Sequence, residues 1–146
     1  MRPDLNQWAI MMVDIVASRS TCHRRCVGCV FLNDKGHVIA TGYNGVAQGA
    51  PHCRGTDGVR CPAADATSGC NLDGCEAVHA EQNALIQCRN VWEINSAYIS
   101  CSPCMTCCKM LLNTSCKAII YKELYDPKAL ALWERSGRHH EKWYFG

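Results

Sequence analysis

No apolar run in this sequence approaches the roughly 20 residues that a helix needs to cross a bilayer, so we expect no membrane partner. An excess of basic charge is also missing, because 15 Lys and Arg residues are balanced by 13 Asp and Glu residues. A protein that binds nucleic acid usually carries a strongly basic face, so we expect no nucleic-acid partner, although a local basic pocket fits this balance. Residues 1–10 lack the pattern of an export signal, which favours a cytoplasmic protein.

Low-complexity segments are absent as well, and only 19% of the 146 residues are charged, whereas 48% are hydrophobic. That composition argues against disorder and suffices for one compact domain with a core of its own. We therefore treat residues 1–146 as a single domain, with its core over roughly 5–136 and an insertion over roughly 46–78.

Cysteine is the abundant residue: the chain has 13, a content typical of disulfide scaffolds in small secreted proteins. The odd count, the missing export pattern and the length of the chain all disfavour that class. We expect instead a reduced protein in which some of the cysteines bind metal.

The hydrophobic periodicity predicts alternating helices and strands. Asp4 precedes a predicted amphipathic helix, whose apolar residues at helical spacing are Leu5, Trp8, Ala9, Met12, Ile15 and Val16. The other predicted elements are strands at 27–32 and 37–41 joined by a turn at 33–36, a helix at 79–88, a strand at 97–100, a helix at 103–112, a strand at 118–121 and a helix at 127–136. The first two strands form an antiparallel hairpin, and the later alternation implies parallel neighbours. We expect an α/β three-layer sandwich, with a mixed sheet of about five strands covered by helices.

Residues 46–77 show no periodicity, which is unusual for so long a segment in a small domain unless something ties it down. The candidates for that role are His52, Cys53, Cys61, Cys70 and Cys75.

Two short segments carry the chemistry, and both lie at the starts of predicted helices. They are His79-Ala80-Glu81 and Pro103-Cys104-Met105-Thr106-Cys107, and together they match the H-x-E and P-C-x-x-C signature of zinc deaminases that act on nucleobases. A catalytic zinc takes three protein ligands, here His79, Cys104 and Cys107, and keeps one position open for water. The start of a helix also favours the thiolate form of cysteine. We expect Glu81 to move protons between that activated water and the departing amine instead of binding the metal.

Each segment alone has an ordinary explanation. A His-Ala-Glu sequence is common on helices, and the cysteine pair also fits a redox motif or half of a closed structural zinc site. Their joint occurrence favours a catalytic zinc. Cys101 and Cys104 form a second C-x-x-C spacing, but Pro103 indicates that Cys101 ends a strand while Cys104 and Cys107 share a helical turn.

The sequence resembles the deoxycytidylate (dCMP) deaminases of the cytidine deaminase superfamily over roughly residues 19–125. The two zinc segments indicate the superfamily, and the Gly-Tyr-Asn-Gly loop and cysteine-bearing insertion indicate the dCMP branch. The matching segments are Arg19-Ser20-Thr21-Cys22, Val27-Gly28, Thr41-Gly42-Tyr43-Asn44-Gly45, His79-Ala80-Glu81-Gln82-Asn83-Ala84 and Ser102-Pro103-Cys104-Met105-Thr106-Cys107.

The resemblance implies hydrolytic deamination of dCMP at C4 of the cytosine to dUMP and ammonia, which feeds thymidylate synthesis. It implies substrate contacts from Asn44, Tyr125, Ala80 and Ser102, although Asn44 also fits plain turn chemistry. Arg24 is our candidate for the 5′-phosphate, since a guanidinium suits phosphate oxygens, with Arg25 as its rival and a solvated surface arginine as the alternative.

Members of this family are often hexamers that dCTP activates and dTTP inhibits, with Mg²⁺ on the effector phosphates. On this resemblance Tyr43 and Gly45 are effector-binding candidates. Two positions depart from the family pattern: Ala47 stands where proline is usual, which bears on the allostery, and Gln82 replaces a commoner apolar residue.

The resemblance further implies a second, structural zinc that pins the insertion. Cys22 and Cys53 match its ligands by position, and the others are expected among Cys70, Cys75 and His52, since four ligands close such a site. The alternative is that these cysteines bind no metal. The remaining cysteines outside the zinc segments are expected to be small buried residues: Cys26, Cys29, Cys88, Cys108 and Cys116.

Other readings remain open at this point. The substrate could be cytidine, dCTP, a pterin-like base or a base in RNA, of which the last is disfavoured by the near-neutral charge. The chain could also belong to a different class, as a catalytically silent, zinc-stapled binding module, that is, a protein without catalytic activity that zinc stabilises. Such a protein would still bind zinc through His79, Cys104 and Cys107, but its properties would not depend on Glu81.

Overall fold

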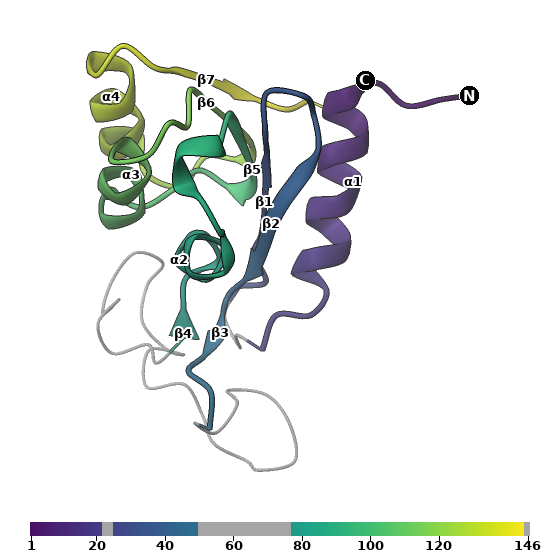
Figure 1. Cartoon of the computed structure of the whole chain (residues 1–146). Coiled ribbons are helices and arrows are strands. Elements are labelled where there is room, and N and C mark those ends of the chain that lie inside the picture. The colour runs from purple at the N-terminus through teal and green to yellow at the C-terminus, as the bar shows by residue number, and fades with distance from the viewer. Residues whose placement is uncertain (22–24, 50–76, 145–146) are drawn as a thin grey trace.

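A computed structural model describes residues 1–21, 25–49 and 77–144 of the chain. Its centre is a five-stranded sheet in the order β2-β1-β5-β6-β7 (Figure 1). The strands are β1 (Gly28–Leu32), β2 (Val38–Tyr43), β5 (Ser96–Cys101), β6 (Ala118–Glu123) and β7 (His139–Lys142). β1 runs antiparallel to β2 and β5, whereas β5, β6 and β7 are parallel. The predicted hairpin and the predicted mixed sheet are both confirmed.

Helices cover both faces of this sheet. In Figure 1, α1 (Leu5–Ala17) lies on one side, and α2 (Ala80–Gln87), α3 (Met105–Leu112) and α4 (Pro127–Arg135) lie on the other. The alternation of side chains along a strand divides the core accordingly. In β1, Cys29 and Phe31 face α2–α4, while Val30 and Leu32 face α1. The predicted three-layer α/β architecture is therefore confirmed.

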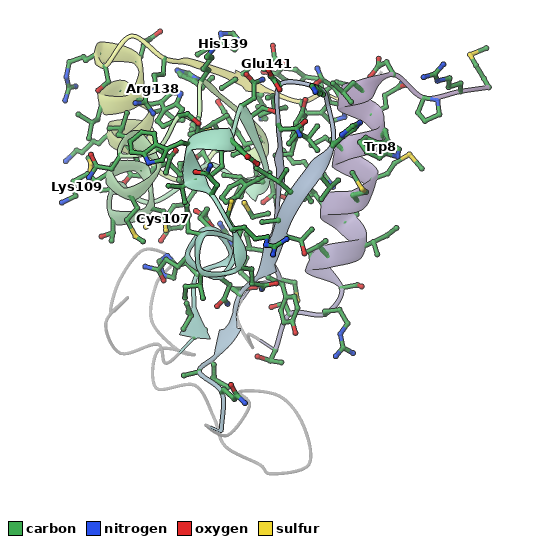
Figure 2. All side chains as sticks on the ribbon, in the orientation of Figure 1. Trp8, Cys107, Lys109, Arg138, His139 and Glu141 are labelled. Atoms are coloured by element: carbon green, nitrogen blue, oxygen red, sulfur yellow. The ribbon has the colours of Figure 1, made fainter. Side chains whose placement is uncertain are left out.

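The predicted apolar face of the first helix is confirmed only in part, because Ala9, Met12 and Val16 are in the core or pack against it, whereas Leu5, Trp8 and Ile15 are exposed. Ala9, Ile10 and Val13 are buried, whereas Trp8 is 38% exposed and Ile15 69% exposed, and Trp8 lies on the outer side of α1 (Figure 2). The reason is a close approach: a Cβ on Gly28 would lie 2.4 Å from the backbone oxygen of Val13. The face with Ala9, Ile10 and Val13 therefore lies on the sheet, and α1 keeps an apolar outer side.

Two helix starts illustrate how local sequence sets an element boundary. Asp126 caps α4 by accepting a hydrogen bond from the backbone of Lys128 at 3.0 Å, with Pro127 in the first turn as predicted. The prediction that Pro103 occupies the first turn of its helix is wrong, because Cys104 is the N-cap residue and α3 begins at Met105.

The last strand, β7, has no counterpart in the predicted elements. Its sequence is polar throughout, so no apolar alternation announces it. The strand exists because its backbone pairs with β6, from Ala118 opposite His139 to Tyr121 opposite Lys142. It lies at the edge of the sheet, where a polar strand is tolerated. A short 3-10 helix at Val91–Glu93 is likewise without a sequence signal.

The ends of the segment without periodicity are held together by a small sheet. β3 (Gly45–Val46) pairs antiparallel with β4 (Ala77–Val78). The residues proposed for the second zinc and for tying down the insertion (Cys22, His52, Cys53, Cys61, Cys70 and Cys75), together with Arg24, lie outside the described residues.

Every cysteine in the described part of the chain is free of disulfides. Cys29, Cys108 and Cys116 are buried, as predicted. Cys26 is exposed and Cys88 is only partly buried, so for these two the prediction of burial is wrong. Within the described ranges, no helix has the length and apolar character required to cross a membrane.

Candidate active site

Three side chains with metal-binding atoms converge where two helices begin. His79 is the N-cap residue of α2, Cys104 is the N-cap residue of α3, and Cys107 is the third residue of α3. Their ligand atoms all lie within 4.8 Å of one another. Nδ1 of His79 is 3.3 Å from Sγ of Cys107 and 3.5 Å from Sγ of Cys104 (Figure 2 labels Cys107). The structure thus brings together the residues predicted from the two segments.

The approach of α2 to the sheet depends on Gly42 in β2. A Cβ at this position would lie 2.3 Å from the backbone oxygen of Ala80 and 2.4 Å from the backbone nitrogen of Ala84. Only a residue without a side chain allows this distance. Asn83 adds a hydrogen bond from its side-chain Nδ2 to the backbone oxygen of Tyr43 at 2.8 Å. These contacts seat the helix start that carries His79.

The electrostatics favour a metal at this point. A hydrogen bond from the Cys107 thiol, together with His79, lowers the pKa of Cys104 to about 4. The same contact and burial raise the pKa of Cys107, and a hydrogen bond with Cys104 raises the pKa of His79. One ligand is therefore anionic before any metal arrives. One imidazole nitrogen and two thiol sulfurs are a donor set that zinc prefers, and three protein ligands leave a fourth position for water.

Glu81 lies beside this group, in the first turn of α2. Its side chain is 5% exposed, and burial raises the pKa of the carboxyl to about 7. The carboxyl is within hydrogen-bonding reach of the Cys107 thiol. A buried carboxyl with a pKa near neutrality is suited to accept and return a proton at working pH.

Cys101 lies close by but is not part of this group of three. It is the last residue of β5, as predicted, and burial raises the pKa of its thiol to about 12. Among the described residues, the metal-binding group contains Cys104 and Cys107 but not Cys101.

An arginine and a tyrosine meet next to Cys101. The guanidinium of Arg25 lies 5.3 Å from the centre of the Tyr125 ring, and it also hydrogen-bonds to the Cys101 thiol. Ser102, which is buried, holds the chain before α4 in place: its Oγ accepts hydrogen bonds from the backbone of Tyr125 at 2.7 Å and of Asp126 at 3.4 Å. Tyr125 is thereby fixed beside the strand end that precedes Cys104.

The side chain of Asn44 is hydrogen-bonded to neighbouring segments of the chain. Its Oδ1 accepts hydrogen bonds from the Ser20 hydroxyl and from the backbone of Val27 at 2.8 Å, and its Nδ2 donates to the backbone oxygen of Arg25 at 2.6 Å. Asn44 therefore shapes the segment that carries Arg25. Its predicted contact with substrate stays a prediction.

The remaining predicted contact residues lie around the start of α2. Ala80 is its first residue and is buried, Tyr43 ends β2, and Gly45 begins β3 beside the hydroxyl of Thr21. The predictions that Ala80 binds substrate and that Tyr43 and Gly45 bind an effector stay untested.

From the sequence, Gln82 is a departure from the family pattern with no structural role assigned to it. The Oε1 atom of Gln82 accepts a hydrogen bond from the backbone nitrogen of His79 at 2.9 Å. The signal was available, because a glutamine three positions after a helix start is typical of a capping box. This capping box is not identified from the sequence because histidine is not a usual cap residue.

Comparison with known proteins adds independent findings. The model of the family described as the cytidine and deoxycytidylate deaminase zinc-binding region matches residues 4–123. A deoxycytidylate deaminase of Schizosaccharomyces pombe is 36% identical over 127 residues, which are 86% of this chain but only 39% of that protein. A deoxycytidylate deaminase of Mycobacterium phage D29 is 34% identical over 125 residues, 82% of this chain and 95% of that protein.

The fold has counterparts among solved structures. The crystal structure of dCMP deaminase from cyanophage S-TIM5 in complex with dCMP and dUMP superposes with a TM-score of 0.75 at 24% identity. The match covers 98% of this chain and 99% of that one. The fold of the described residues therefore has a counterpart among solved structures.

Proposed function

The chain belongs to the cytidine and deoxycytidylate deaminase zinc-binding family, and we propose that it hydrolyses dCMP to dUMP and ammonia. The observation that carries this proposal is the group of His79, Cys104 and Cys107 with the buried carboxyl of Glu81 beside it. The relative from phage D29, a deoxycytidylate deaminase, supports dCMP as the substrate because this chain matches 95% of its length. The solved relative with bound dCMP and dUMP has the same fold.

The proposed chemistry assigns a separate task to each part of the site. A zinc ion held by His79, Cys104 and Cys107 would supply a Lewis acid that activates water at neutral pH. Glu81 accepts a proton from the attacking water and delivers it to the base, so that the exocyclic amine leaves as ammonia. Burial of Glu81 keeps its proton from exchanging freely with solvent.

We assign recognition of the 5′-phosphate to Arg25. Its guanidinium is held by the Tyr125 ring and the Cys101 thiol next to the metal-binding group, and a guanidinium matches phosphate oxygens in geometry and charge. Arg24, the first candidate from the sequence, remains the rival. Tyr125 would line the nucleotide pocket together with Asn44, Ala80 and Ser102.

Replacing Arg25 with alanine tests the phosphate assignment. We expect kcat/KM for dCMP to fall by about 10- to 100-fold, since a hydrogen bond to a charged group contributes about 1.5–3 kcal/mol. Cytidine carries no phosphate, so its turnover should not change. Ammonia release from both substrates measures the effect, with Arg89→Ala, an exposed arginine after α2, as the matched control. Equal losses for dCMP and cytidine would assign Arg25 to packing on Tyr125 alone.

The substrate itself is tested by ammonia release from dCMP, cytidine, dCTP and cytosine, side by side, with zinc-loaded protein. Turnover of dCMP with little from cytidine supports the proposal. Activity on cytidine or dCTP would keep the zinc chemistry and reassign the pocket. Absence of ammonia from all four would favour the silent zinc-stapled module.

On the family resemblance we also propose a second, structural zinc held by Cys22 and Cys53 with ligands among Cys70, Cys75 and His52. The pairing of β3 with β4 supports an insertion that is anchored at its ends. We expect elemental analysis of the purified protein to find two zinc ions per chain. A value of one per chain would remove the second site.

Self-association and effector control complete the proposal. The exposed apolar side of α1, with Trp8 and Ile15, would be covered in a hexamer, which light scattering would detect. Regulation by dCTP and dTTP with Mg²⁺, through Tyr43 and Gly45, rests on the resemblance. The cytoplasmic location rests on the missing export pattern in residues 1–10.

A further inference from the structure

Two hydrogen bonds among the described residues hold the backbone of His79, the histidine of the metal-binding group: its carbonyl oxygen accepts from the backbone nitrogen of Asn83 at 2.9 Å, and its own nitrogen donates to a side chain. Gln82, in the first turn of α2, accepts the bond from the backbone nitrogen of His79 through Oε1 at 2.9 Å. His79 precedes the first residue of the helix and has an extended backbone, so the helical bond from Asn83 fixes its carbonyl side but not its nitrogen side. The Gln82 bond therefore acts on the residue whose side chain must point at the two sulfurs.

An equivalent hydrogen bond is present at the start of α1, which allows a comparison within one molecule. At the start of α1, the Oε1 atom of Gln7 accepts a hydrogen bond from the backbone nitrogen of Asp4, also at 2.9 Å. There the cap residue Asp4 uses its own side chain to accept a hydrogen bond from the Gln7 backbone at 2.8 Å. In α2 the cap residue instead directs its Nδ1 to Cys107 and Cys104, at 3.3 Å and 3.5 Å.

This difference determines what each glutamine does. In α1 the glutamine stabilises a helix end and nothing more. In α2 the position of the Cα–Cβ bond of His79 sets where the ring can reach, because a side chain swings about that bond through a few preferred rotamers. A fixed backbone at His79 thus limits the ring to orientations near the sulfurs before a metal binds.

We propose that Gln82 is a positioning residue for the metal: its bond to the His79 backbone holds Nδ1 toward Cys104 and Cys107 and so strengthens zinc binding. The proposal rests on the zinc site of the proposed function but not on its substrate. Groups that orient a metal ligand from outside the coordination sphere typically change metal affinity by about 10- to 100-fold when removed. Pre-organisation of the ligand supplies the physical reason, since less conformational freedom is lost on binding.

The test measures the zinc dissociation constant of the full chain by competition with a chromogenic chelator. We expect Gln82→Leu to weaken zinc binding by about 10- to 100-fold. Gln82→Glu keeps an oxygen acceptor at the same place and should restore the affinity to within a few-fold of the unsubstituted protein. Gln7→Leu, which removes the equivalent bond from α1, should leave the affinity unchanged even if it lowers the melting temperature.

Three results would overturn the proposal. Unchanged zinc affinity in Gln82→Leu would show that the bond does not orient the ligand. A loss of affinity in Gln7→Leu as large as that in Gln82→Leu would show that general destabilisation explains both. A protein that binds no zinc at the His79 group would remove the proposal and the zinc chemistry together. If the zinc affinities follow the expected pattern but the protein releases no ammonia from dCMP, the role of Gln82 is supported and the proposed substrate is refuted.

Discussion

We expect the Glu81→Gln protein to bind the zinc of the catalytic site as the unsubstituted protein does and to lose nearly all turnover of dCMP. Glutamine has the same size as glutamate, so the buried site beside Cys107 keeps its packing, but it cannot accept and return a proton. General acid–base catalysis contributes about 100- to 10,000-fold, and we expect a loss of kcat of that order. Ammonia release and elemental analysis of the same preparation measure both quantities.

The exposed Glu93→Gln protein provides the matched control, because it removes the same charge from the surface of the short helix after α2. Its turnover should equal that of the unsubstituted chain. Two results would contradict the role assigned to Glu81. Loss of zinc in Glu81→Gln would make the carboxyl a ligand, and full activity would favour the silent zinc-stapled module.

The second large effect is expected from Cys104→Ser. Serine is a good N-cap residue, so the start of α3 should be preserved, whereas the thiolate that Cys104 supplies at its lowered pKa is lost. We expect the protein to lose one zinc per chain and all measurable turnover. It should also lose the stabilisation that bound metal confers, about 4 kcal/mol at a zinc concentration of 1,000 times the dissociation constant. Elemental analysis and thermal unfolding with and without added zinc measure these changes.

Cys108→Ala is the control for that experiment. Cys108 follows Cys107 directly in α3 and is fully buried, but its Sγ contacts the backbone oxygen of Ala129 and not the metal-binding group. Its replacement should lower the melting temperature while the zinc content stays unchanged. If Cys104→Ser retained its zinc, or if Cys108→Ala lost it, the ligand set would have to be revised.

Much of this site could be predicted from the sequence because its metal-binding residues lie at the starts of helices. His79 and Cys104 are both cap residues, and Cys107 follows Cys104 within one helical turn. Where a helix begins is decided by a few neighbouring residues, so local sequence places these ligands reliably. Local sequence also predicted the hairpin, the place of Pro127 in the first turn of α4 and the end of β5 at Cys101.

Other features of the site could not be read in this way. The stacking of Arg25 on Tyr125 joins residues 100 positions apart in the chain, and the close approach of α2 to β2 depends on what faces Gly42. β7 is a strand only because β6 offers an unpaired edge to a polar segment. None of these contacts leaves a periodic or spaced pattern in the sequence.

The sequence by itself therefore determined the family, the three residues that form the metal-binding group and the alternating order of helices and strands, and it predicted Glu81 as the acid–base residue. The tertiary structure alone decided which residues of α1 are buried and that Arg25 lies over the ring of Tyr125. The physical reason is the distance along the sequence between the residues that decide each feature. Ligand type and helix capping depend on side chains within a turn of one another, whereas burial and pairing depend on which distant segments the folded backbone brings into contact.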